Sequence, residues 1–162
     1  MRKPSADVLA QIAKGLRAFH RKEMLHQDVR PDNIMVDATG TVKIIDFGST
    51  KITGVVEAEP SGMHSDILGT QQYTAPEYFV GERATARSDL FSLGIVLYQM
   101  LTGKKPFIED EQRSVMHKIR LERHPRVRKL NPDIPRELER IVDKCLEKQQ
   151  RDRWQSAQQV VM

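Results

Sequence analysis

Three oxygen-bearing side chains lie on either side of one short predicted β-hairpin. Asp28 and Asn33 precede it within residues 26–33 (HQDVRPDN), and Asp46 follows it in Asp46-Phe47-Gly48. Because a hairpin returns its two ends to the same place, Asn33 and Asp46 are expected to lie side by side. An amide oxygen beside a carboxylate suits Mg²⁺ that carries phosphates. Asp28 would then face the same spot as a base for an attacking hydroxyl, and Arg30 would point at the phosphate oxygens.

The elements that must position these residues can be predicted from the pattern of apolar residues. Two β-branched runs, 33–36 and 42–45, flank a turn with Asp37 and Gly40, and this pattern predicts the hairpin. Before it, apolar residues at helical spacing predict a helix of about four turns from Ser5 to near His20. After it, residues 49–74 show no sustained period, and so long a loop is uncommon without a function.

The rest of the chain is predicted to be helical. Residues 88–101 are apolar on nearly every face, which is typical of a helix buried at the centre of a domain, and Gly103 ends it. Shorter helices are predicted around 115–119, after Pro135 and after the N-cap Ser156. The predicted fold class is therefore mainly α with one small β-hairpin.

The charge balance and the single cysteine indicate which partners and which cellular compartment to expect. The 26 Lys and Arg residues exceed the 22 Asp and Glu residues only mildly. A basic cluster lies within residues 120–129; it is interrupted by Pro125 and lacks aromatic residues. This pattern favours a solvated connector, and no nucleic-acid partner is expected. The chain has no segment that could cross a membrane, and its lone Cys145 favours a reducing, cytoplasmic compartment, although the parent protein could be membrane-anchored. The cluster consists of Arg120, Arg123, Arg126, Arg128 and Lys129.

The three motifs together resemble the C-terminal lobe of eukaryotic-like Ser/Thr protein kinases. Residues 26–33, Asp46-Phe47-Gly48 and Ala75-Pro76-Glu77 follow the order of the family's catalytic loop, D-F-G and A-P-E motifs. Residues 153–157 (RWQSA) are similar to a late pattern of the bacterial members. The resemblance implies one partial domain over 1–162, the C-lobe of an α+β two-lobed fold without its N-lobe. Its parts would be the catalytic loop 26–33, the D-F-G motif 46–48, the activation segment 46–77 and the αF helix at about 88–102.

The resemblance also implies a role for each motif residue. Asp28 would be the catalytic base, Arg30 would stabilise the γ-phosphoryl group and Thr70 would support the catalytic loop. Asn33 and Asp46 would hold Mg²⁺ (or Mn²⁺), and Met35 would form a floor for the adenine of ATP. The structural support would come from His26 packed near Phe47 of the D-F-G motif with Gly48, from Asp89 bracing the loop backbone, and from Arg153 paired with Glu77.

Two functions are compatible with these residues. The first is a protein Ser/Thr kinase fragment that transfers the ATP γ-phosphoryl group to a substrate hydroxyl once an N-lobe or fused domain completes it; the chain alone would be nearly inactive. The alternative is a truncated or pseudokinase-like lobe that binds a protein partner, in which Asp28 and Asn33 would only cap a loop. Gln27 stands where many kinases carry an Arg that grips an activation-loop phosphate, and Arg30 replaces a Lys. In either case Met35 is expected to be exposed in this chain alone.

Overall fold

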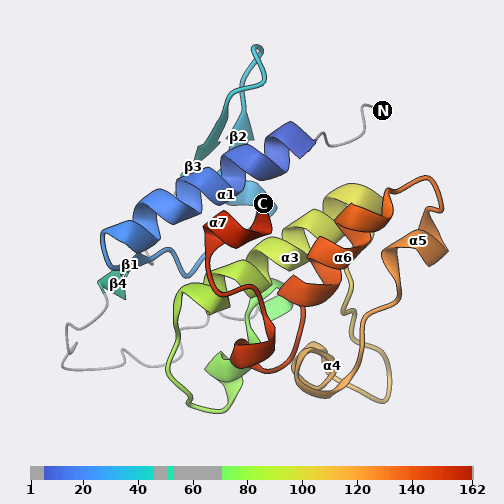
Figure 1. Ribbon diagram of the computed structural model, residues 1–162. Coiled ribbons are helices and arrows are strands. Elements are labelled where there is room, and N and C mark those ends of the chain that lie inside the picture. The colour runs from blue at the N-terminus through green and yellow to red at the C-terminus, as the bar shows by residue number, and fades with distance from the viewer. Residues whose placement is uncertain (1–5, 46–50, 53–70, 162) are drawn as a thin grey trace.

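The structure is a computed structural model that describes residues 6–45, 51–52 and 71–161 (Figure 1). A long central helix, α3, packs against α6, while α1 lies beside the β2–β3 hairpin and contacts α7 near the C-terminus. The mainly helical fold class with a small hairpin is confirmed. No helix in these ranges combines the length and apolar composition that a membrane crossing requires. The helices are α1 (Ala6–Arg21), α3 (Ala86–Thr102), α4 (Val115–Leu121), α5 (Val127–Leu130), α6 (Arg136–Cys145) and α7 (Ala157–Val160), and the strands are β1 (Met24–Leu25), β2 (Ile34–Val36), β3 (Val42–Ile44) and β4 (Lys51–Ile52).

Helix α3 is the centre of the core. Every residue from Ser88 to Tyr98 is buried, as its apolar run predicts. The helix begins two residues earlier than expected because Thr85 caps it: the Thr85 hydroxyl accepts from the Arg87 amide, and Ser88 accepts from the Thr85 amide. Helix α6 lies so close that a Cβ built at Gly94 would fall 2.5 Å from the Cβ of Cys145. Only glycine fits this crossing of α3 and α6.

The hairpin pairs β2 with β3 in the antiparallel register that places Met35 opposite Lys43. Its turn is held by the Asp37 carboxylate, which accepts from the amides of Thr39 and Thr41 at 2.8 and 2.9 Å. Gly40 has φ +84°, a left-handed conformation that glycine adopts without steric cost. The hairpin therefore carries Asn33 at its entrance and Ile45 at its exit, as the sequence predicts.

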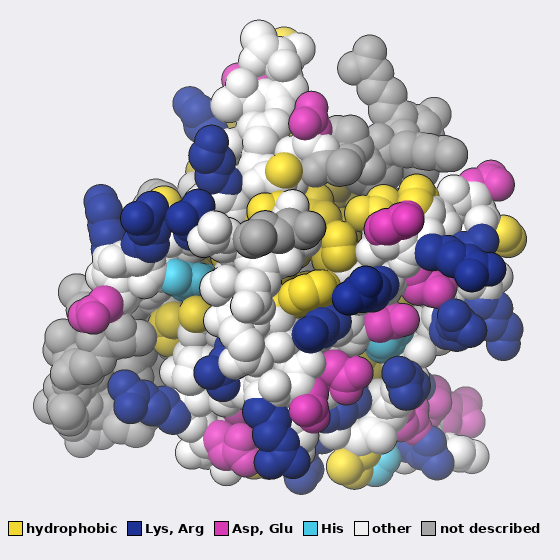
Figure 2. Space-filling model, in the orientation of Figure 1, with side chains coloured by type: hydrophobic (Ala, Val, Ile, Leu, Met, Phe, Trp, Pro, Cys, Tyr) yellow, Lys and Arg dark blue, Asp and Glu magenta, His cyan; other side chains and the backbone are white. Residues whose placement is uncertain are grey.

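Two features differ from the sequence analysis. Within the segment that shows no period, β4 pairs with β1 at the end of α1. The basic stretch is exposed at Arg120, Arg123, Arg126 and Lys129, as expected of a solvated connector, but it also contains helix α5. In α5 Val127 is fully buried, and the Arg128 amide donates to Glu139 of α6 at 2.9 Å. Figure 2 shows Lys and Arg side chains gathered over α5 and the adjoining part of α6. Val127 is the apolar side chain that anchors α5 in the core, and the charged side chains around it face outward.

Candidate active site

The backbone of residues 26–27 is held by one buried carboxylate at the start of α3. Asp89 is 2% exposed, and its two oxygens accept hydrogen bonds from the His26 and Gln27 amides, each at 2.9 Å. The Nε2 atom of His20, from the last turn of α1, lies 2.8 Å from the same carboxylate. Gln27 adopts φ +67°, a conformation that costs a non-glycine residue free energy. The two hydrogen bonds that Asp89 accepts stabilise this sharp bend.

His26 connects the same loop to the far end of the hairpin. Its side chain is fully buried; Nδ1 accepts from the Asp28 amide at 3.2 Å, and Nε2 lies 3.1 Å from the Ile45 carbonyl. Because Nδ1 accepts, Nε2 carries the proton and donates to Ile45. The ring also packs edge-on against Phe19, with centroids 5.5 Å apart. His26 thereby fixes the loop relative to the residue that precedes Asp46.

Asp28 and Asn33 lie in direct contact. The Nδ2 atom of Asn33 donates to the carboxylate Oδ2 of Asp28 at 3.0 Å and to its carbonyl at 2.7 Å. Asn33 is 6% exposed at the end of a 3₁₀ turn, and its own carbonyl accepts from the Ile45 amide at 2.8 Å. The hairpin thus brings residue 45, the neighbour of Asp46, to Asn33. Asp46 itself lies outside the described residues.

Glu77 and Arg153, 76 positions apart, form a buried ion pair. The guanidinium donates from Nη1 and Nη2 to the two Glu77 oxygens at 2.7 and 2.8 Å, and Arg153 is 1% exposed. The Ser88 hydroxyl adds a third hydrogen bond to Glu77 at 2.6 Å. Burial alone would raise the pKa of Glu77, but Arg153 and Ser88 outweigh it and hold that pKa below its usual value. The pair ties the segment before α3 to the C-terminal part of the chain.

Comparison with known proteins gives the same answer as the motifs. Residues 2–162 match the protein kinase domain family. The chain belongs to the protein kinase family. It is 44% identical over 109 residues to a serine/threonine-protein kinase PknA of Corynebacterium glutamicum, which covers 67% of this chain and 23% of the relative. It is also 37% identical over 150 residues to PknA of Mycobacterium tuberculosis, and 35% identical over 156 residues to PknB of Mycobacterium leprae.

These relatives are bacterial serine/threonine-protein kinases, as the resemblance implies. The two mycobacterial alignments each cover 93% of this kinase chain but only 33% and 24% of the relatives. The chain therefore spans between about a fifth and a third of the length of the curated relatives that it matches.

Within this kinase chain, Arg30 lies in the loop itself, and Met35 follows the loop in β2. Met35 is 58% exposed and Val36 54%, as expected for the chain alone. Arg30 donates from Nη2 to Asp32 at 3.0 Å, and its guanidinium lies 5.7 Å from the centre of the Tyr73 ring. Thr70, Phe47 and Gly48 lie outside the described residues, as do residues 46–50 and 53–70 of the expected activation segment. Their predicted roles stay predictions.

Sequence reasoning missed two residues near the loop, one that contacts the loop and one that contacts the carboxylate that holds it. His20 binds Asp89, and Tyr73 lies under Arg30 with its hydroxyl donating to Gln99 of α3 at 2.6 Å. The signal for His20 was weak, a histidine in the last turn of a helix. Tyr73 follows Thr70 by three residues in a segment that resembles the kinases' substrate-receiving segment, but the resemblance implies a role there for Thr70 only. Both contacts join elements far apart in the sequence, so spacing alone could not identify them.

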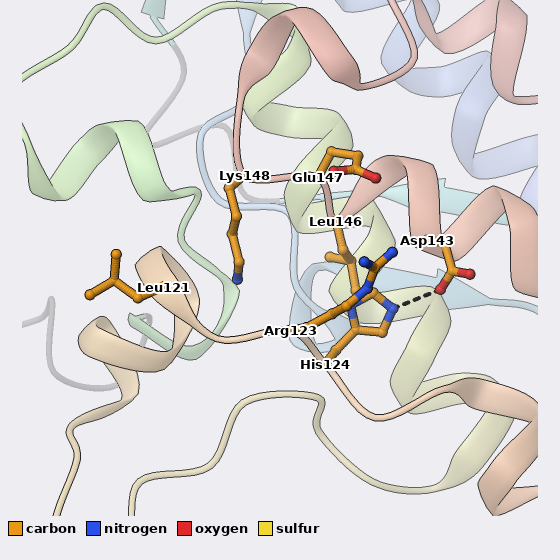
Figure 3. Close-up of a pocket in the computed structure, with 7 residues that line it drawn as sticks. All are labelled: Leu121, Arg123, His124, Asp143, Leu146, Glu147 and Lys148. Carbon is orange, nitrogen blue, oxygen red and sulfur yellow. Dashed lines mark hydrogen bonds and ion pairs between the residues drawn. The ribbon is translucent and has the colours of Figure 1, made fainter.

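A separate pocket of about 150 Å³ lies between the end of α4 and α6 and contains none of the predicted site residues (Figure 3). In it, His124 Nε2 lies 2.7 Å from Asp143, and burial lowers the pKa of His124 more than Asp143 raises it. The Lys148 amine donates to the Lys118 and Ile119 carbonyls at 3.2 and 2.6 Å. These are carbonyls in the last turn of α4, so Lys148 acts as a cap of that helix.

Proposed function

We propose that the protein transfers the γ-phosphoryl group of ATP to a Ser or Thr hydroxyl of a protein substrate, with Asp28 as the base. The observation that carries the proposal is the contact between Asp28 and Asn33, in a loop whose backbone is held by Asp89. A carboxylate held in one orientation is suited to accept the proton of an attacking hydroxyl. A lobe that served only to bind partners would have no need of this arrangement.

The donor set fits a divalent cation and a nucleotide. Both hydrogen bonds of the Asn33 side chain use Nδ2, so Oδ1 is the atom that would bind Mg²⁺ or Mn²⁺ together with Asp46. The bound cation would neutralise charge on the phosphates. Arg30 would approach the γ-phosphoryl group, Thr70 would support the loop, and Met35 would contact the adenine. The exposure of the Met35 side chain in this chain supports the presence of a further part of the protein, an N-lobe or a fused domain, that covers the nucleotide.

The domain assignment is part of the same proposal. Residues 1–162 would form the C-lobe, with the catalytic loop at 26–33, the D-F-G motif at 46–48, the activation segment at 46–77 and α3 as the αF helix. A cytoplasmic site of action is supported by the one cysteine, Cys145, which is a buried free thiol.

The test is phosphate transfer by the full-length protein with Mg-ATP and a generic Ser/Thr substrate. Asp28→Asn should lower kcat by about 10²–10⁴-fold, since a positioned base contributes that much, and leave ATP binding nearly unchanged. The matched control is Asp37→Asn, an exposed carboxylate in the hairpin turn whose hydrogen bonds an amide oxygen can also accept. Near-normal turnover of Asp28→Asn would exclude Asp28 as the base, and no transfer by the wild-type protein would contradict the proposed activity.

A further inference from the structure

Tyr73 lies between two cationic side chains beside the candidate active site. Its ring is 8% exposed and is fixed by the hydrogen bond from its hydroxyl to Gln99 of α3. The Arg30 guanidinium lies 5.7 Å from the ring centre and the Lys105 amine 5.8 Å from it. We refer to Arg30, Tyr73 and Lys105 as the Tyr73 platform. Two positive charges on one aromatic ring form a local concentration of charge that favours an anion.

The positive charge of the platform is only partly neutralised. Arg30 forms an ion pair with Asp32, but that carboxylate is 77% exposed, and water screens such a pair strongly. The Nε atom of Arg30 is buried and has no hydrogen-bond partner among the described residues. Lys105 donates to the neutral side-chain oxygen of Gln72, and within the described ranges it forms no ion pair. The platform therefore offers an ammonium group that has no carboxylate partner among the described residues.

The platform adjoins the residue proposed to accept the substrate proton. Arg30 follows Asp28 by two residues in the same loop, while Lys105 comes from the segment after α3. A peptide that places a hydroxyl at Asp28 extends across the surface next to it. Residues of the substrate close to the phosphoacceptor would then lie within reach of the two cations.

We propose that the Tyr73 platform is a subsite for an acidic substrate residue, in which Lys105, beside Arg30 on the Tyr73 ring, selects protein substrates with Asp or Glu close to the phosphoacceptor. This inference rests on the proposed function. A carboxylate in the subsite gains charge-assisted hydrogen bonds that a neutral amide or a cation lacks. Lys105 is a specificity residue, whereas Arg30 also approaches the transferring phosphate.

The test compares kcat/KM of the full-length kinase for peptide substrates that differ at one position. Each peptide carries one acceptor and Glu, Gln or Lys at each of four positions on either side. We expect Glu to be preferred over Gln by about fivefold at one or two positions, in KM rather than kcat, because half-exposed ion pairs contribute little more. Lys105→Glu should reverse this preference in favour of Lys. Lys105→Met, which keeps the apolar stem on the Tyr73 ring, should abolish it.

Lys104→Glu is the matched control, because Lys104 is the exposed neighbour of Lys105 and carries the same charge. It should keep the wild-type preference. Equal rates for Glu and Gln at every position in the wild-type kinase would overturn the inference, and so would equal effects of Lys104→Glu and Lys105→Glu or an unchanged preference in Lys105→Met. All these outcomes differ from failure of the proposed function, in which the wild-type protein would transfer phosphate to none of the peptides.

Discussion

Replacing Asp89 by Ala should destabilise the protein and the loop of residues 26–33 together. The substitution removes the acceptor of the buried His26 amide and of the half-buried Gln27 amide, and the partner of His20. A buried donor left without its partner costs about 1–3 kcal/mol, so the two amides together predict a loss of up to about 6 kcal/mol. This is a large share of the total free energy of unfolding of a typical domain, which is about 5–15 kcal/mol.

The same change should lower activity more than the stability loss accounts for. Gln27 adopts φ +67°, and the substitution removes the hydrogen bond from its amide to Asp89 that offsets the cost of that conformation. The loop would relax and displace Asp28, and a displacement of about 1 Å can lower the rate about 10²-fold. Urea denaturation followed by circular dichroism measures the first effect. Phosphate transfer at saturating Mg-ATP, well below the unfolding temperature, measures the second.

The matched variant is Asp152→Asn, which changes an exposed acid near the C-terminus and should shift stability by less than about 0.5 kcal/mol. An Asp89→Ala protein whose unfolding midpoint and kcat both match the wild type would refute the reasoning. It would show that the two hydrogen bonds neither stabilise the loop nor place Asp28.

Three further perturbations test other parts of the structure. Arg153→Met should cost about 3–5 kcal/mol in urea denaturation because it leaves the Glu77 carboxylate buried and unpaired, and adding Glu77→Gln should recover part of the loss; equal stability of both variants would contradict this. Burial lowers the pKa of Lys148 to about 8, so the folded state binds fewer protons than the unfolded state up to about pH 10; the Tm of the wild type relative to Lys148→Met should therefore rise from pH 8 to 10. Burial raises the pKa of Cys145 to about 12, so a thiol reagent at pH 8 should label it only on global unfolding, and rapid labelling of the folded protein would disprove this.

Local sequence patterns were sufficient for the elements whose burial follows a period. The all-round apolar run of α3 and the β-branched runs of the hairpin each determine their own conformation, and both are present as predicted. The pairing of β1 with β4 could not be predicted, because two strands of two residues each have no detectable alternation. Helix α5 was not predicted for the same reason. Its four residues lie in a basic stretch bounded by prolines, and they show one buried side chain, Val127, and no period.

In the candidate site, too, some contacts follow from local sequence patterns and others do not. The hairpin argument brings Asn33 and the residue before Asp46 together, and the structure has the Asn33 carbonyl bonded to the Ile45 amide. The bracing by Asp89 and the pair of Glu77 with Arg153 were inferred from the family resemblance alone, since 62 or more residues separate each pair of partners. The placement of Tyr73 between two cations depends on three distant segments, which no local pattern encodes.

The bond between Glu77 and Arg153 has a consequence for folding during synthesis. During synthesis, Glu77 and the whole of α3 leave the ribosome long before Arg153 does. Until Arg153 emerges, the Glu77 carboxylate lacks the guanidinium with which it is paired in the folded core. Helix α7, which covers α1, arrives later still. Although chains generally fold from the N-terminus as they are made, the core around α1 and α3 closes only when Arg153 and α7 have left the exit tunnel. A stalled nascent chain that ends before residue 153 should therefore remain sensitive to protease and attractive to chaperones.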